Sequence, residues 1–176
     1  DRVIMLESGQ VVVDGTPVDA LRAFRERYNV QAGQEPEHGD RRLEILKTIV
    51  TDGAGRPKDR FTPGDALGIE FEVVAHEPTD DWVAGVAINN HLDLLVYGTN
   101  TTLQGIELPP ISGRRRVCYR FDAIPMVEGQ YYVTVAVHPK VGPEYHRLDR
   151  AVSFKVFSEA ADHGVLHLTP RFEVSE

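Results

Sequence analysis

Residues 124–137 read Ile-Pro-Met-Val-Glu-Gly-Gln-Tyr-Tyr-Val-Thr-Val-Ala-Val, and this stretch decides the fold. Every second residue from Tyr131 is large and apolar, as expected for a β-strand, whose successive side chains point to opposite faces of a sheet. We expect one side of this strand to face a core, namely Tyr131, Val133, Val135 and Val137. The other side is expected to point outward, namely Tyr132, Thr134, Ala136 and His138.

The strand opens with the turn Gly129-Gln130-Tyr131. A tyrosine two residues after a glycine, at the start of an alternating strand, resembles the tyrosine corner of immunoglobulin-like sandwiches. In that corner the tyrosine hydroxyl bonds back to the backbone where the chain crosses between two sheets. Tyr131 is therefore expected to be buried at such a crossover.

A period of two also runs through the rest of the chain from Arg42 onward. It predicts strands near residues 43–51, 66–75, 82–90, 94–98, 115–121, 129–138, 150–157, 164–168 and 171–174. Turn sequences such as Asp52-Gly53 and Pro63-Gly64-Asp65 separate these strands. Many short strands with such turns and no helical period predict a mainly β fold, an immunoglobulin-like antiparallel β-sandwich over residues 42–176.

Residues 1–41 follow a different pattern. Val3-Ile4-Met5-Leu6 and Val11-Val12-Val13 are short apolar runs that predict a β-hairpin. A helix is expected from Thr16, a good N-cap followed by Pro17, to about Tyr28, with an apolar face made of Val18, Leu21 and Phe24. Residues 29–41 are polar and contain Gly and Pro, which predicts a linker. Because the chain opens abruptly at Asp1-Arg2, we expect it to be a piece of a longer protein.

The charge and the cysteine content disfavour several classes of protein. The formal net charge is −8, which argues against nucleic acid as a partner and against direct docking on anionic lipid. The run Arg114-Arg115-Arg116 is interpreted as the solvated beginning of a strand and not as a phosphate site. A single cysteine, Cys118, allows no internal disulfide and fits a reducing compartment. No apolar run approaches the roughly 20 residues that cross a bilayer.

No catalytic constellation is recognised in the sequence. It contains no Gly-x-Ser-x-Gly, no His-Glu-x-x-His and no cysteine pair with zinc spacing. His163 and His167 are four residues apart, but in a strand that spacing separates side chains by about 13 Å, too far to share a metal. Asp80 and Asp81 precede Trp82 and are more typical of a solvated loop than of a glycosidase. We therefore predict no catalytic and no metal-binding residues.

The unusual feature is aromatic surface that should point outward, since strand parity places both Tyr132 and Phe157 outside. Flat aromatic faces that cover sugar C–H groups, with a few polar partners, are what a carbohydrate site requires. The predicted carbohydrate-binding residues are Tyr132, Thr134, His138, Asn89, Lys155 and Phe157, with Tyr97 at the margin. A protein–protein contact is an equally good interpretation of this surface. The other sheet is the weaker candidate, because its outward charges can pair across strands, namely Glu70, Glu72, Arg116 and Arg120.

Residues 1–28 resemble the end of an ABC-transporter nucleotide-binding domain. The resemblance is carried by Asp1-Arg2-Val3-Ile4-Met5-Leu6, Gly9, Gln10-Val11-Val12, Gly15-Thr16-Pro17 and the helix that reaches Phe24. In that family the switch histidine, the phosphate-binding loop, the signature motif and the catalytic glutamate all lie upstream. None of these motifs is in the chain, so we expect no enzyme activity and no cofactor here. The resemblance implies ATP and Mg²⁺ for a longer parent protein.

Residues 42–176 resemble the C-terminal domain of Wzt-type subunits, the ATP-binding subunits of O-antigen polysaccharide exporters. The matching stretches are Phe61-Thr62-Pro63-Gly64-Asp65, Gly85-Val86-Ala87-Ile88, Val96-Tyr97-Gly98-Thr99-Asn100-Thr101, Gly129-Gln130-Tyr131-Tyr132-Val133, and Asp149 through Phe154-Lys155-Val156. Together they span nearly all of this segment. Their order after the ATPase-like residues strengthens the resemblance.

The resemblance implies a non-catalytic domain that recognises the end of an undecaprenyl-linked polysaccharide and couples it to export. It also implies a transmembrane permease as partner, a homodimer that sometimes exchanges its last strand, and a peripheral place on the cytoplasmic side of the bacterial inner membrane. No contact residue transfers, since each family member recognises its own glycan. The alternative hypothesis is a structural domain that dimerises the transporter ATPase without binding glycan. An enzyme that modifies the glycan is disfavoured, because no acid pair stands at a plausible position.

Overall fold

The structure is a computed structural model that describes residues 2–7, 9–17, 20, 23, 37–159 and 163–174. The chain divides into two compact units, residues 1–35 and residues 36–176. In the first unit, β1 (Val3–Glu7) and β2 (Gln10–Gly15) form an antiparallel hairpin, as predicted. The predicted helix at residues 16–28 falls largely outside the described residues, as do Val18, Leu21 and Phe24. Pro17, Ala20 and Ala23, which the structure does describe, have helical conformation, and the Ala20 N–H donates to the carbonyl oxygen of Thr16 at 3.0 Å.

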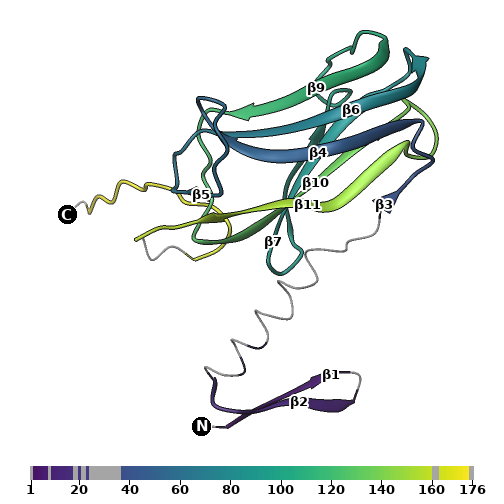
Figure 1. The fold of residues 1–176 in the computed structure, drawn as a ribbon. Helices are drawn as coiled ribbons and strands as arrows, with labels where there is room; N and C mark the ends of the chain where they lie inside the picture. Colours follow the sequence, from purple (N-terminus) through teal and green to yellow (C-terminus); the bar gives the residue numbers. More distant parts are fainter. Residues whose placement is uncertain are drawn as a thin grey trace. The chain divides into compact units, whose positions relative to one another are not determined.

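The second unit consists of two antiparallel sheets (Figure 1). The larger sheet has the strand order β3-β11-β10-β7-β8, with β5 added beside β11 in parallel. Its strands are β3 (Glu37–His38), β5 (Arg60–Phe61), β7 (Val83–Asn90), β8 (Leu95–Asn100), β10 (Gly129–His138) and β11 (His146–Val156). The smaller sheet has the order β4-β6-β9, with strands β4 (Leu43–Asp52), β6 (Leu67–Thr79) and β9 (Ile111–Phe121).

The predicted strands before residue 157 are present with shifted ends, and the sandwich is confirmed. The predicted strands at 164–168 and 171–174 are wrong. Within residues 163–174 the structure has only an isolated bridge between Leu166 and Met126. Apolar residues do alternate within residues 163–174, but no neighbouring strand covers them. Their side chains therefore stay in solvent, with Phe172 88% and Val174 80% exposed.

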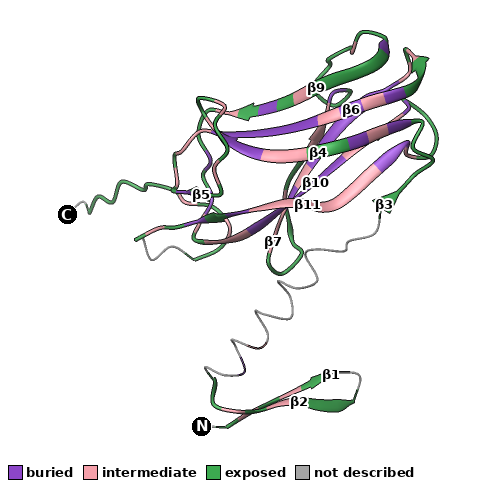
Figure 2. Cartoon of the chain, in the orientation of Figure 1, coloured by how far each residue is buried: buried purple, intermediate pink, exposed green. Residues whose placement is uncertain are grey.

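One face of each sheet forms the core (Figure 2). Tyr131, Val133, Val135 and Val137 are all buried, as strand parity predicts. The Tyr131 hydroxyl donates to the carbonyl oxygen of Val127 at 2.9 Å, and the ring stacks on Phe154 with centroids 5.5 Å apart. The tyrosine corner is therefore confirmed.

A bulge in β11 shapes the outer surface of the larger sheet. Val133 of β10 lies opposite Val152, but Val135 lies opposite Leu148, so residues 149–151 project opposite Thr134. Arg150, inside this bulge, has a φ of 47°, a left-handed conformation that is uncommon for a residue other than glycine. Extra residues of this kind re-aim a side chain, and here they turn Arg150 over the outer surface.

Candidate functional site

The structure brings together three of the seven predicted site residues on the outer face of the larger sheet. Asn89 of β7 lies directly opposite Tyr132 of β10, and Thr134 is two residues further along β10. Three residues that the sequence did not indicate join them: Asp93, Asp149 and Arg150. We name this set of six residues the Arg150 cluster.

Tyr132 does not present an open face to solvent, so that part of the prediction is wrong. Its side chain points away from the core as expected, yet the residue is only 4% exposed. The guanidinium of Arg150 lies 4.8 Å from the centre of the Tyr132 ring and forms an ion pair with Asp93. Burial raises the pKa of Tyr132, against a smaller opposite effect of the Arg150 charge.

The polar groups of the Arg150 cluster bond to one another. The Thr134 hydroxyl oxygen accepts a hydrogen bond from the backbone N–H of Arg150 at 3.2 Å and lies 3.4 Å from an Asp149 carboxylate oxygen. The Asn89 side-chain amide donates to the carbonyl oxygen of Asp93 at 3.0 Å. A surface whose stacking ring and hydrogen-bonding groups are engaged in this way is poorly suited to take up a sugar.

Three other predicted residues lie apart from this cluster. Phe157 is 43% exposed, but it is four residues beyond Ser153, the residue opposite Tyr132, which corresponds to about 13 Å along the strand. Lys155 lies opposite Gln130, nearer to Phe157 than to the cluster. His138 is at the far end of β10, six residues or about 20 Å from Tyr132.

Tyr97 was predicted at the margin of the outer face, and this is wrong. The β7–β8 hairpin pairs Tyr97 with Ile88, which is buried in the core. Residues directly opposite each other share a face, so Tyr97 points toward the smaller sheet. Its ring packs edge-on against Phe121 of β9, with centroids 5.4 Å apart.

This contact lies in a groove of about 490 Å³ lined by β8, β9 and the segments beside them. We name it the edge groove, because in the described sandwich β8 pairs only with β7 and β9 only with β6. Its aromatic lining residues are Trp82, Tyr97, Tyr119 and Phe121. Its polar and charged lining residues include Thr101, Gln104, Arg115, Arg116 and Arg120.

Two of the aromatic rings are held in place by hydrogen bonds. The Tyr119 hydroxyl donates to the carbonyl oxygen of Ala84 at 2.7 Å, and the Trp82 indole N–H donates to the carbonyl oxygen of Pro109 at 2.9 Å. Burial raises the pKa of Tyr119 to about 12, so the phenol stays protonated and continues to donate. Tyr97 is the more open ring, with 38% of its surface exposed.

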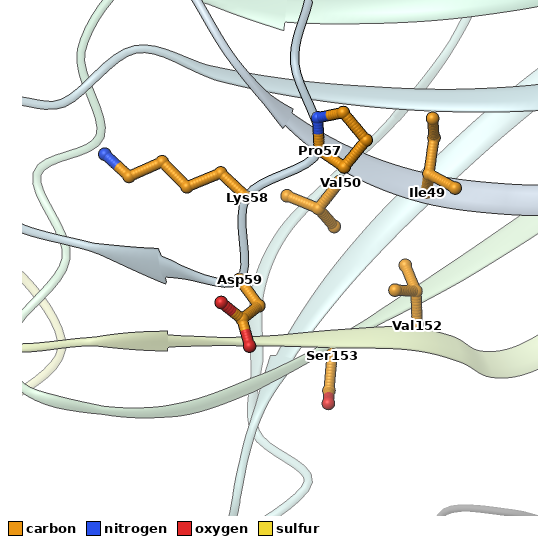
Figure 3. A pocket seen from close by; sticks show the side chains of 7 residues that line it. All are labelled: Ile49, Val50, Pro57, Lys58, Asp59, Val152 and Ser153. Carbon is orange, nitrogen blue, oxygen red and sulfur yellow. The ribbon is translucent and has the colours of Figure 1, made fainter.

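Two other hollows are weaker candidates. One, of about 300 Å³, lies between β4, β11 and residues 57–59 (Figure 3). It has no aromatic lining residue, and Lys58 extends away from the apolar residues to bond Asp65 at 2.8 Å. The other, of about 540 Å³, has Phe157 as its single aromatic lining residue. The edge groove is therefore the candidate site.

The described residues give no sign of a metal centre. No group of three or more His, Cys, Asp or Glu side chains among them could hold a metal ion. Within the same residues, no helix combines the length and the apolar character needed to cross a membrane.

Two packed antiparallel sheets joined by a tyrosine corner define residues 36–176 as an immunoglobulin-like β-sandwich domain. A family model described as the Wzt C-terminal domain matches residues 34–168, and the chain belongs to this family. The resemblance of residues 42–176 to this family, predicted from the sequence, is thereby confirmed. The family places the chain among the domains of polysaccharide ABC exporters.

One solved structure agrees with this fold. The crystal structure of the C-terminal domain of Wzt aligns with a TM-score of 0.73 and 18% identity, over 81% of this chain and 90% of that chain. At this identity the likeness concerns the fold alone. A Pseudomonas fluorescens alkylpurine DNA glycosylase, AlkC, aligns with a TM-score of 0.44 and 14% identity, over 79% of this chain and 36% of that chain, which carries no argument. No curated protein matches the chain.

Proposed function

We propose that the sandwich is the carbohydrate-binding domain of a polysaccharide ABC exporter, and that the glycan binds in the edge groove. The observation that carries the proposal is the set of four aromatic side chains lining one groove, beside amide and guanidinium groups. Binding of the glycan end in this groove would couple recognition to export.

The groove has the physical properties of a sugar site. Ligand pockets commonly have volumes of about 300–1,000 Å³ and few polar groups among apolar walls, and the edge groove has about 490 Å³. The open ring of Tyr97 offers a flat apolar face to the C–H groups of a sugar. Gln104 lines the same groove and supplies a side-chain amide for sugar hydroxyls.

The proposal includes the assembly that the sequence suggested. Residues 1–28 would be the end of an ATPase domain and residues 29–41 a linker to the sandwich, with Glu37–His38 already paired to β11. The parent protein would bind ATP and Mg²⁺, associate with a transmembrane permease, and act on a lipid-linked polysaccharide at the cytoplasmic side of the bacterial inner membrane.

Substitution in the groove tests the proposal. Tyr97→Ala should weaken binding of the source strain's polysaccharide by about 1–2 kcal/mol, the value of burying one aromatic face. That corresponds to roughly a 5- to 30-fold rise in Kd by calorimetric titration. Phe157→Ala is the matched control, since Phe157 is a similarly exposed aromatic residue outside the groove. If Phe157→Ala abolishes binding and Tyr97→Ala does not, the site lies elsewhere.

A second function, dimerisation, is favoured by the C-terminal segment. Residues 163–174 expose Leu166, Leu168, Phe172 and Val174 at alternate positions, the pattern of a strand that has no sheet. Pairing of residues 171–174 with a second copy would bury Phe172 and Val174. Light scattering at high micromolar concentration should give the mass of a dimer, and truncation after Pro170 should give a monomer. A full-length chain that remains monomeric would contradict this function.

A further inference from the structure

The loop between β7 and β8 exposes three leucines at its tip. Leu92 is 71% exposed, Leu94 52% and Leu95 59%. The loop projects beyond the end of the larger sheet, and all of residues 91–95 are exposed (Figure 2). Large apolar side chains that stand together on a surface mark a contact with another molecule.

Hydrogen bonds within the loop hold these leucines in their exposed positions. The side-chain oxygen of Asn90 accepts from the backbone N–H of Leu92 at 2.9 Å and from that of Leu94 at 3.0 Å. The Asp93 N–H donates to the carbonyl oxygen of Asn90, and the Asn90 N–H donates to that of Leu94, both at 3.0 Å. The Asn89 side-chain amide donates to the carbonyl oxygen of Asp93. The loop therefore has a defined shape that presents the leucines outward.

The same bonds prepare the loop to leave water. A backbone N–H without a partner is costly in an apolar medium, and the N–H groups of Leu92, Asp93 and Leu94 already have partners inside the loop. Of residues 92–95 only Asp93 is charged, and it forms an ion pair with Arg150. The tip thus combines apolar side chains, satisfied donors and a neutralised charge.

The size and shape of the tip favour a bilayer over a protein as the molecule that it contacts. A stable protein interface buries about 800 Å² on each partner, and three leucine side chains offer less than half of that area. A projecting tip also requires a matching hollow in a protein partner. A bilayer imposes neither condition, because apolar side chains enter between the headgroups to a depth of about 5–10 Å.

We infer that residues 92–95 insert into the surface of a lipid bilayer. This inference goes beyond the proposed function and does not depend on glycan binding. The leucines drive the insertion, so it requires no anionic headgroup. That agrees with the net charge of −8, which disfavours docking on anionic lipid by charge.

Co-sedimentation of the 176-residue chain with phosphatidylcholine vesicles tests the inference. The parent chain should bind, and neither high salt nor added phosphatidylglycerol should be needed. Leu92→Ser and Leu94→Ser should each lower the partition coefficient about fivefold. Their melting temperatures should match that of the parent chain, because both side chains lie in solvent.

Leu103→Ser is the matched control. Leu103 is 75% exposed and lies in the loop that follows the other end of β8. Its backbone N–H also donates to an asparagine side chain, that of Asn100. Because a loop at the opposite end of the strand cannot enter the same bilayer surface, Leu103→Ser should bind vesicles as the parent chain does.

The possible results distinguish this inference from its competitors and from the proposed function. A parent chain that does not co-sediment refutes it, and if Leu92→Ser also reduces the mass in light scattering, the tip is a protein contact. Vesicle binding that survives both serine substitutions, or that requires phosphatidylglycerol and disappears in high salt, also refutes it. Leu92→Ser should bind the source strain's polysaccharide as the parent chain does, so failure of the glycan site leaves the membrane result unaffected.

Discussion

His146 should make the stability of the sandwich depend on pH just below neutrality. The residue lies on β11 and is 2% exposed. Its Nδ1 accepts a hydrogen bond of 2.8 Å from the backbone N–H of Ile45 on β4, so it joins the two sheets. Only a neutral imidazole with its proton on Nε2 can accept this bond. Protonation would place a second N–H against that of Ile45.

The direction of the pKa shift decides whether a fall in pH raises or lowers the stability of the sandwich. Burial lowers the pKa of His146, and the nearby Arg41 lowers it further, against a smaller opposite effect of Glu44. The unfolded chain, with an ordinary histidine pKa of about 6.5, then binds the proton more readily than the folded protein. Stability is therefore lost as the pH falls below about 6.5, by up to about 1.4 kcal/mol per pH unit, and the loss ends below the folded pKa.

Urea unfolding at pH 7.5, 6.5 and 5.5 measures this effect. The parent chain should lose unfolding free energy between pH 6.5 and 5.5, by at most about 1 kcal/mol. His146→Asn keeps an acceptor near the position of Nδ1 but does not titrate, so it should lose much less. His76→Asn is the control, because the His76 side chain is 56% exposed and pairs with Glu44 at the surface. An equal loss in His146→Asn and the parent chain would refute the reasoning.

Three further predictions concern the corner, a close backbone approach and the Arg150 cluster. Tyr131→Phe removes the donor to Val127 and should lower the unfolding free energy by about 1–2 kcal/mol in urea; an unchanged value would contradict the role of the corner. Gly39→Ala should lower the melting temperature, because φ is +112° and a Cβ would stand 2.3 Å from the carbonyl oxygen of Tyr145; calorimetry showing no change would be contrary. Arg150→Ala should leave polysaccharide binding unchanged in a titration, and a lost affinity would move the site to the outer face.

The sandwich could be predicted because its determinants are local in sequence. The alternation from Tyr131 to Val137 and the turn before it specify which side chains are buried, and burial follows them. The same alternation failed at residues 163–174, because a period of two indicates a strand only where a partner strand is available.

The site could be predicted only in part. Strand parity gave the outward direction of Tyr132, but its exposure depends on Arg150 of β11 and on Asp93 of the β7–β8 loop. The conformation that brings Arg150 there, a left-handed residue in a bulge, has no glycine or asparagine to indicate it. The alternation of residues along a strand predicts which way a side chain points, but it does not predict whether residues distant in sequence cover that side chain.

The edge groove could not be predicted from the sequence, for a different reason. Tyr97 and Phe121 meet although their strands do not pair with each other. The register of the β7–β8 hairpin decides which face Tyr97 takes, and its loop, residues 91–94, carries no turn signal that specifies the register.

The most direct test of the central claim is to map glycan contact by NMR without any substitution. Titration of the ¹⁵N-labelled chain with the source strain's polysaccharide should shift amide signals of residues 97–106 and 115–121, which border the edge groove. Signals of residues 132–134 and 149–155 on the outer face should stay in place. Shifts confined to the outer face, with residues 97–106 and 115–121 unchanged, would contradict the groove as the site of glycan binding.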